Sequence, residues 1–342
     1  MSILAPLLFR CDAGPQIGLG HVVRCLALAE AFLNRGHAVE FVSDFGGLEW
    51  PARQLAERGL PHAPPQDPSP AHLVAYAAEK GAAAVIVDSY QPTSDDLAAL
   101  CGHGFVVAAL DDEAKRALPV DVLINQNLGA EKLPYETRAD TMKLLGSEYA
   151  LLRRELITAR ERGLQREHPL VAMNVALMMG GTDPRGLAVT ALQALAATKW
   201  PLTVRWIASR LPADVPDLPT LEIEVVAGAD DVAPHFLWCD LALSAAGSTA
   251  WELACLGAPM ALVSAFANQQ IIYDNLLRAG AAAGLGGAAD AEPTAWCDKL
   301  IPLLEDATLR GHLSRTAAVL VDGKGAERVA AAIWSCVEKE KA

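Results

Sequence analysis

The sequence predicts an α/β protein with two successive domains, each built on an open parallel β-sheet. Short aliphatic and β-branched runs alternate with longer amphipathic runs of helical period along the chain. The strand-like runs of the first half carry β-branched or aliphatic residues on both faces, as expected when helices cover both sides of a parallel sheet. The chain has 342 residues, which is enough for two domains.

The first half of the sequence contains predicted strands and helices as far as the "NQN" segment. The predicted strands cover residues 4–12, 37–44, 82–90, 105–113 and 121–127. The predicted helices cover residues 21–36, 49–59, 69–81 and 93–104. A polar, charged helical stretch follows at 151–169, and we place the end of an N-terminal domain, residues 1–155, within it.

The same alternation starts again after Pro169. The predicted strands cover residues 171–181, 202–209, 221–228, 240–247 and 258–265. The predicted helices cover residues 184–198, 230–239, 248–257, 268–280 and 293–306. We assign residues 156–325 to a C-terminal domain and residues 326–342 to a C-terminal helix.

The composition favours a cytoplasmic protein that acts on a small molecule. Hydrophobic residues make up 52%, yet no apolar run approaches the ~20 residues of a membrane helix, and "MSILAPLLFRC" lacks the features of a signal peptide. The seven cysteines have no CxxC spacing, which indicates free thiols. The net charge of −13 argues against a nucleic-acid-binding protein. We expect neither membrane nor nucleic acid as a partner.

Glycine and polar residues concentrate directly after the predicted strands. In open α/β sheets, ligands bind at the carboxyl ends of the strands. We therefore expect a ligand-binding crevice that is lined by "QIGLGH", "DSY", "LDDE", "NQN", "GGTD" and "SAAGST".

The segment "QIGLGHVVR" holds the first candidate site. It is not a dinucleotide fingerprint, because Val23 stands where the third glycine is needed, and no Lys-Ser pair marks a P-loop. A helix that begins at Gly20 or His21 puts His21 in its first turn, where the helix dipole disfavours an imidazolium. A neutral histidine suits a general base, and Arg24 lies on the same helix face. The alternative is that His21 only caps the helix.

The segments "GGTDPRG" and "SAAGSTAWE" hold the second candidate site. Glycines before a helix let a phosphate approach backbone N–H groups. Asp183 can also be an ordinary N-cap, with Pro184 at the first helical position. Thr249 and Glu252 have the spacing of a capping box, or Glu252 accepts hydrogen bonds from two ribose hydroxyls. The spacing leaves both readings of Glu252 open.

Further polar residues stand at strand ends and at a helix start. They suit an amino sugar, a magnesium site or a glycosidase-like carboxylate pair, or they cap the following helices. The strand-end group is Asp88, Tyr90, Asp111, Asp112, Glu113, Asn125 and Asn127. Asn268 and Gln269 begin a helix that contains Asn275, and they either reach a diphosphate or sugar or act as caps.

Together these motifs resemble a family of nucleotide-sugar enzymes. The chain is similar to the UDP-2,4-diacetamido-2,4,6-trideoxy-β-L-altropyranose hydrolases of pseudaminic acid biosynthesis in "FRCDAGPQIGLGHVVR", "IVDSYQ", "LDDE", "DVLINQN", "GSEYALLRREL" and "MMGGTDP". The second-half pattern also resembles the lipid-linked N-acetylglucosaminyltransferase of peptidoglycan synthesis. The resemblance implies the GT-B fold, with two Rossmann-like domains whose parallel sheets face a central cleft. The chain departs from the family at "SAAG" and at Trp251, before Glu252.

The resemblance also implies an activity: hydrolysis of a UDP-activated diacetamido-trideoxy sugar at the anomeric carbon, with inversion and without a metal or cofactor, by a monomer. His21 would be catalytic. The implied substrate-binding residues are Gly18, Gly20, Arg24, Tyr90, Asp112, Asn125, Asn127, Asn268 and Gln269. The implied nucleotide-binding residues are Gly180, Gly181, Thr182, Ser248, Thr249 and Glu252. The alternative is a GT-B glycosyltransferase with a UDP-sugar donor, in which an acceptor hydroxyl replaces water.

Overall fold

The computed structural model describes residues 5–14, 18–65, 67, 69–180 and 183–340. The chain divides into two compact units, Met1–Arg153 with Lys324–Ala342 and Arg154–Gly323. Each unit contains a six-stranded sheet in which all neighbouring strands are parallel. The predicted α/β class with two parallel sheets is therefore confirmed.

The first unit has the strand order β2-β1-β3-β4-β5-β6. Its strands are β1 (Leu7–Cys11), β2 (Val39–Phe41), β3 (Ala84–Asp88), β4 (Val106–Leu110), β5 (Val122–Asn125) and β6 (Met142–Leu145). From β1 the chain moves to one side for β2 and to the other side from β3 onward. Doubly wound sheets bind ligands at this point of reversal, which here lies between β1 and β3.

Helices cover both faces of the first sheet, which explains why its inner strands β1, β3, β4 and β5 are buried along their whole length. Leu7 and Phe9 of β1 pack in one core with α1 (Gly20–Asn34), while Leu8 packs in another with α3 (Pro70–Lys80) and α4 (Ser94–Leu100). Helix α2 (Glu49–Glu57) follows β2 along the chain. Two short 3₁₀ turns, η1 (Ala130–Lys132) and η2 (Ser147–Tyr149), flank β6.

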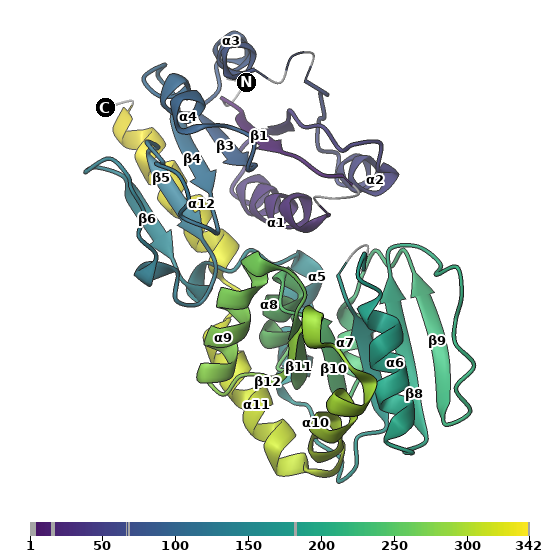
Figure 1. The fold of residues 1–342 in the computed structure, drawn as a ribbon. Helices are drawn as coiled ribbons and strands as arrows, with labels where there is room; N and C mark the ends of the chain where they lie inside the picture. Colours follow the sequence, from purple (N-terminus) through teal and green to yellow (C-terminus); the bar gives the residue numbers. More distant parts are fainter. Residues whose placement is uncertain (1–4, 15–17, 66, 68, 181–182, 341–342) are drawn as a thin grey trace. The chain divides into compact units, whose positions relative to one another are not determined.

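The C-terminal helix returns to the first unit. Helix α12 (Gly325–Glu340) packs against α1 and β4, and Figure 1 shows it in yellow beside the blue strands. Val329, Ile333 and Val337 recur at helical spacing and join the same core as Phe32 of α1. The chain thus begins and ends in one core.

The second unit has the strand order β12-β11-β10-β7-β8-β9. Its strands are β7 (Asn174–Met178), β8 (Leu202–Ala208), β9 (Leu221–Ala227), β10 (Leu241–Ala245), β11 (Met260–Ser264) and β12 (Ala283–Gly287). The direction of strand addition reverses between β7 and β10. The segment "GGTD" follows β7, and "SAAGST" begins with the last two residues of β10. Both segments therefore begin at the carboxyl ends of neighbouring strands.

Helices α6 (Leu187–Ala197) and α10 (Pro293–Glu305) share a core with the second sheet. Helices α5 (Arg154–Leu164), α7 (Ala233–Trp238), α8 (Ser248–Cys255) and α11 (Ala307–Leu320) form a connected group, in which α5 contacts both α7 and α8 and α8 contacts α11. Helix α9 (Gln270–Arg278) packs against β11 and β12, and the 3₁₀ turns η3 (Ala267–Gln269) and η4 (Ala288–Asp290) complete the unit.

Two strands were not predicted, β6 and β12. Both lie at sheet edges, where a strand is only partly covered and need not be continuously apolar. Strand β12 also contains three glycines, and a Cβ on Gly284 would lie 2.3 Å from the Tyr273 hydroxyl oxygen. Close packing of Tyr273 therefore explains a glycine that weakens the strand pattern.

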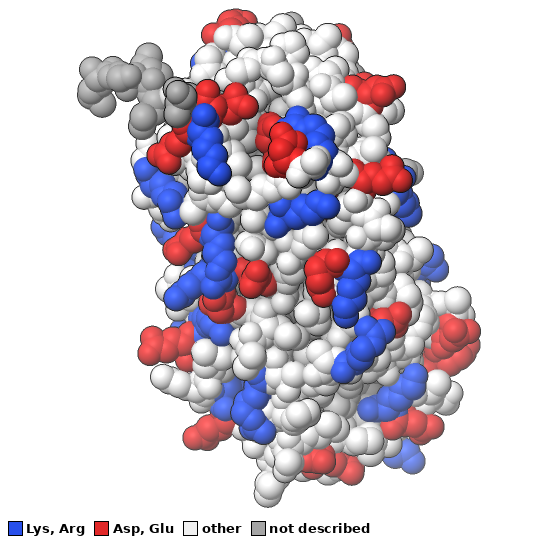
Figure 2. Space-filling view, turned by 90° about the vertical axis from the view of Figure 1, so that its left-hand side faces the viewer, with Lys and Arg blue, Asp and Glu red and all other residues white. Residues whose placement is uncertain are grey.

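The face of the molecule drawn in Figure 2 has no extended basic surface. Figure 2 shows acidic and basic side chains interspersed there. All seven cysteines are free thiols, as predicted. Within the described part of the chain, no helix combines the length and the apolar character needed to cross a membrane.

Candidate functional site

The reversal point of the first sheet brings the glycine loop and the end of β3 together. Cys11 of β1 pairs in register with Asp88, the last residue of β3. Gly18 has φ +84°, a left-handed conformation that side chains disfavour, and α1 then begins at Gly20. His21 accordingly lies in the first turn of α1, as predicted.

His21 and Asp88 form a hydrogen-bonded pair. The His21 Nδ1 lies 2.6 Å from the Asp88 Oδ1. An ionised carboxylate can only accept, so Nδ1 carries the proton and the Nε2 of a neutral ring keeps its lone pair. In the part of the chain that the structure describes, no hydrogen bond engages this Nε2. His21 is 9% exposed and Asp88 is fully buried, so the pair is largely shielded from water.

Asp88 is a fully buried carboxylate that is held in its charged form. Burial by itself would raise the pKa of Asp88, but the charges of Arg24 and His21 and their hydrogen bonds lower it well below its ordinary value. Arg24 donates from Nε to Oδ2 and from Nη2 to Oδ1, both at 2.5 Å. The Cys25 thiol lies 3.6 Å from Oδ2. Asp88 is therefore an anchor for His21, a role that its sequence position alone did not reveal.

Arg24 also joins the ends of β3 and β4. Its Nη1 donates to the Asp112 Oδ2 at 2.7 Å. Asp112 in addition accepts from the Tyr90 hydroxyl at 3.0 Å and from the Asn127 side-chain amide at 2.9 Å. Tyr90, Asp112 and Asn127, which were predicted as one group, are thus brought together around one carboxylate.

Tyr90 is the most exposed of Tyr90, Asp112 and Asn127. Its side chain is 41% exposed, and its ring meets the His21 ring edge-on, with centroids 5.1 Å apart. Burial of its hydroxyl and the charge of Asp112 raise the pKa of Tyr90 far above its ordinary value. The hydroxyl therefore stays protonated and donates to Asp112.

Asn125 belongs to the scaffold of this loop. It is 1% exposed; its Oδ1 accepts from the Asn127 backbone N–H at 2.9 Å, and its Nδ2 donates to the Tyr135 hydroxyl at 2.7 Å. Tyr135 donates in turn to the Asp111 carbonyl. These bonds support the loop that carries Asn127, and a direct contact of Asn125 with a sugar stays a prediction. No sequence motif had singled out Tyr135.

Asp111 turns toward its own loop. Its Oδ1 accepts from the backbone N–H groups of Glu113 at 3.0 Å and Ala114 at 2.8 Å. Asp111 therefore stabilises a turn of its own loop. It is not the helix cap that one alternative predicted, because residues 111–121 between β4 and β5 contain no helix. Among residues 5–14, 18–65, 67, 69–180 and 183–340, no group of three His, Cys, Asp or Glu side chains has the arrangement of a metal site.

The loop after β7 differs from its prediction at the start of α6. Gly180 has φ +84°, while Gly181 and Thr182 lie outside the described residues. Helix α6 begins at Leu187 with Gly186 as N-cap, so Pro184 does not occupy the first helical position. The Asp183 carboxylate nevertheless accepts from the backbone N–H groups of Leu187 at 3.0 Å and Ala188 at 2.9 Å. The chain makes one extra turn because Asp183 and Gly186 both have positive φ.

The helices α6 and α8 both follow strands at the reversal point of the second sheet, but their first N–H groups have different partners. Asp183 already satisfies two N–H groups of α6 and adds a negative charge there, which disfavours a phosphate. Helix α8 instead has Gly247 as N-cap and no side-chain cap. The capping box of Thr249 and Glu252 does not form, because Thr249 is the second residue of the helix rather than its N-cap.

Residues from the end of β11 lie beside the start of α8. The Gln269 Oε1 accepts from the Ala265 backbone N–H at 3.0 Å, and a Cβ on Gly247 would lie 3.4 Å from its Nε2. Asn268 is exposed on η3. The Arg185 guanidinium lies 5.2 Å from the ring centre of Phe266, so the loops after β7 and β11 also meet. Neither Arg185 nor Phe266 was predicted.

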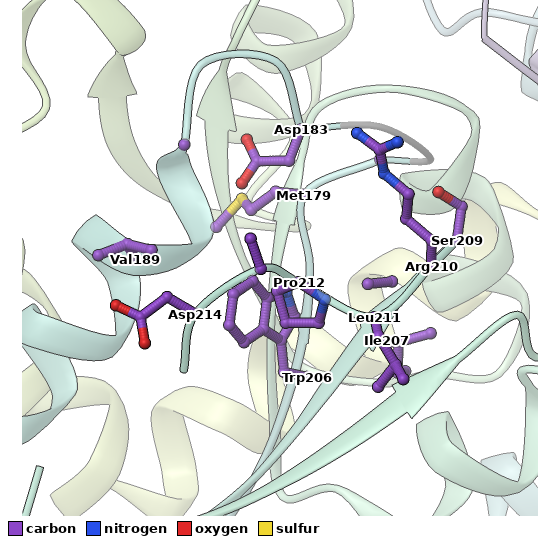
Figure 3. A pocket seen from close by; sticks show the side chains of 14 residues that line it. Met179, Asp183, Val189, Trp206, Ile207, Ser209, Arg210, Leu211, Pro212 and Asp214 are labelled. Carbon is purple, nitrogen blue, oxygen red and sulfur yellow. The ribbon is translucent and has the colours of Figure 1, made fainter. Parts of the chain in front are cut away.

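A pocket of about 560 Å³ adjoins Gly180 in the second unit. Figure 3 shows the Trp206 indole at its centre, between Asp214 on one side and Arg210 on the other. The pocket lies between the loops after β7 and β8. This pocket was not predicted, because no glycine stands between the end of β8 and Pro212.

Two doubly wound parallel sheets in two units define the GT-B class of fold. Similar solved structures include Acinetobacter baumannii MurG, with 18% identity, TM-score 0.68 and coverage of 97% of this chain and 99% of that chain. The spinosyn forosaminyltransferase SpnP has 14% identity, TM-score 0.67 and coverage of 98% and 99%. A UDP co-structure of MnaA from S. aureus has 11% identity, TM-score 0.66 and coverage of 98% and 97%.

In sequence, the chain is similar to the UDP-2,4-diacetamido-2,4,6-trideoxy-β-L-altropyranose hydrolase of Campylobacter jejuni subsp. jejuni serotype O:2. The two are 26% identical over 198 residues, which is 56% of this chain and 66% of that enzyme. The match therefore spans just under two thirds of the relative. No protein-family model matches the chain. The resemblance that the motifs indicate is confirmed by this relative and by the fold.

Proposed function

We propose that the protein hydrolyses a UDP-activated diacetamido-trideoxy sugar and releases UDP and the free sugar with inversion. The observation that carries the proposal is the His21–Asp88 pair, which leaves the His21 Nε2 as a hydrogen-bond acceptor at the carboxyl edge of a doubly wound sheet. The motif resemblance and the 26% identical relative support the substrate class and a step in pseudaminic acid biosynthesis.

In the proposed reaction, His21 acts as a general base. Its Nε2 removes a proton from a bound water, and the water oxygen forms a bond to the anomeric carbon on the face opposite the leaving group. The bond from that carbon to the diphosphate oxygen breaks, and UDP leaves with the electron pair. Asp88 stays ionised and stabilises the imidazolium that forms. General-base catalysis typically contributes ~10²–10⁴-fold.

The leaving group explains why one base is enough. A glycosidase must also protonate a poor alkoxide leaving group, whereas a diphosphate is weakly basic and departs without a proton. We propose that the uncapped start of α8 stabilises the departing charge, with Ser248 and Thr249 in its first turn and Glu252 at the ribose. Gly180, Gly181 and Thr182 complete the proposed diphosphate site, together with Gln269 and Asn268.

The sugar would bind at the carboxyl edge of the first sheet. Tyr90 has the most exposed side chain of Tyr90, Asp112 and Asn127, and its hydroxyl and the Asn127 amide both donate to the Asp112 carboxylate. Gly18 and Gly20 let the backbone approach the sugar closely. These groups provide hydrogen bonds for the acetamido substituents while His21 faces the anomeric carbon.

A glycosyltransferase would use the same residues, with an acceptor hydroxyl in place of water. Incubation with a panel of UDP-sugars in ¹⁸O-labelled water separates these activities by NMR and mass spectrometry. A hydrolase releases UDP without an acceptor and places the label in the free sugar. UDP release that requires an added acceptor would establish the transferase, and label in UDP would exclude cleavage at the anomeric carbon.

A further inference from the structure

We propose that Arg24 is a positioning residue that keeps His21 in its neutral, proton-accepting form by occupying Asp88, and that it does not bind the substrate. The proposal deepens the proposed function, on which the role of His21 as a base rests. It replaces the direct substrate contact that the resemblance implied for Arg24.

The geometry around one oxygen atom carries the proposal. The Asp88 Oδ1 receives the His21 Nδ1 at 2.6 Å and the Arg24 Nη2 at 2.5 Å, and these two nitrogens lie 3.2 Å apart. Both nitrogens donate to the carboxylate and so do not bond to each other. A second proton on His21 would place an imidazolium directly beside the guanidinium, which opposes protonation of the ring.

Apart from Arg24, the side chains named here around His21 are acidic or neutral. The positive charge that offsets Asp88 therefore comes from Arg24. Asp88 comes from β3 and Tyr90 from the loop after it; Asp112 follows β4 and lies on the far side of Arg24. Burial raises the pKa of the Cys25 thiol, which lies 3.6 Å from the Asp88 Oδ2 and is therefore uncharged. Without Arg24, the full charge of Asp88 would act on His21 and favour the imidazolium, a form that cannot accept a proton.

In this arrangement Arg24 directs its guanidinium to protein partners. Its guanidinium is buried, and Nε, Nη1 and Nη2 each donate to a carboxylate oxygen. The planar fork of arginine can hold Asp88 with two bonds and Asp112 with a third. A lysine ammonium at this place would keep the charge but lose the two-point hold on Asp88.

The test compares pH profiles of kcat/KM for Arg24→Met, Arg24→Lys and the control Arg35→Met, which changes the exposed C-cap of the same helix. In Arg24→Met, we expect the acid limb to move to higher pH, because the charge that opposes the imidazolium is gone. The loss of activity therefore shrinks as pH rises. Arg24→Lys should show a smaller shift, and Arg35→Met none.

A loss by the same factor at every pH would overturn the proposal, since substrate binding or folding would then explain the need for Arg24. An NMR titration of the His21 ring without substrate gives a second readout, with the signal assigned by its absence in His21→Asn. We expect the ring to protonate at higher pH in Arg24→Met than in the unchanged protein; equal midpoints would also overturn the proposal. If the unchanged protein hydrolyses no UDP-sugar, the proposed function fails, while the ring titration still tests Arg24.

Discussion

His21 and Asp88 are 67 positions apart in the sequence, yet the His21 Nδ1 lies 2.6 Å from the Asp88 Oδ1. The pair connects the start of α1 with the end of β3 at the point where the first sheet reverses direction. It converts a histidine that could merely have capped a helix into one whose second ring nitrogen is an oriented proton acceptor.

Replacement of His21 by asparagine should abolish turnover while UDP still binds. The amide can donate to Asp88 but cannot accept a proton from water, so kcat should fall by about 10²–10⁴. Calorimetry should give an unchanged Kd for UDP, because the proposed nucleotide residues lie in the second unit. The control His103→Asn, at an exposed position of the first unit, should keep full activity. Normal turnover by His21→Asn would exclude the general-base role.

Replacement of Asp88 by asparagine should reduce kcat nearly as much. An amide that donates to Nδ1 would favour the ring tautomer with a proton on Nε2, which cannot accept one from water. Loss of the orienting carboxylate costs up to about 10⁴-fold in enzymes with an Asp-His pair. Asp95→Asn, at an exposed site in the first turn of α4, is the matched control. A kcat close to normal in Asp88→Asn would mean that Asp88 does not set the tautomer.

The stability of the protein should depend on Asp88 in acid. The pKa of Asp88 is lowered in the folded state, so its stabilising effect is complete above the ordinary carboxyl pKa of about 3.9 and is lost as pH falls below it. Chemical denaturation of the unchanged protein and of Asp88→Asn should therefore give free energies of unfolding that converge between about pH 4 and pH 2. A difference that stays constant over this range would contradict the assigned shift.

Replacement of Asp183 by alanine should weaken the fold without weakening UDP binding. The carboxylate holds two N–H groups at the start of α6, and loss of such a cap costs about 1 kcal/mol. Its removal also takes a negative charge away from the proposed diphosphate site, so the Kd for UDP should stay equal or fall. Asp217→Ala, an exposed change in the loop after β8, should alter neither quantity. Weaker UDP binding by Asp183→Ala would identify the carboxylate as part of the nucleotide site.

Much of the fold could be predicted because the signals are local. Buried strands of a parallel sheet are apolar on both faces, and this pattern located inner strands such as β1, β3, β7 and β10. The edge strands β6 and β12 escaped, since partial exposure and the glycines of β12 remove that pattern. Glycines also marked the loops after β1 and β7, where Gly18 and Gly180 have a positive φ that other residues disfavour.

The sequence by itself determined the α/β class, the strand ends that carry polar groups and the place of His21 in the first turn of a helix. Only the tertiary structure decided which of those groups meet. Asp88 became the partner of His21 because β1 and β3 are neighbours, and Arg24, Asn125 and Asp183 direct their polar groups to protein partners. Helical and strand periodicity is a property of adjacent residues, whereas strand order and hydrogen bonds between distant residues arise only when the whole sheet is assembled.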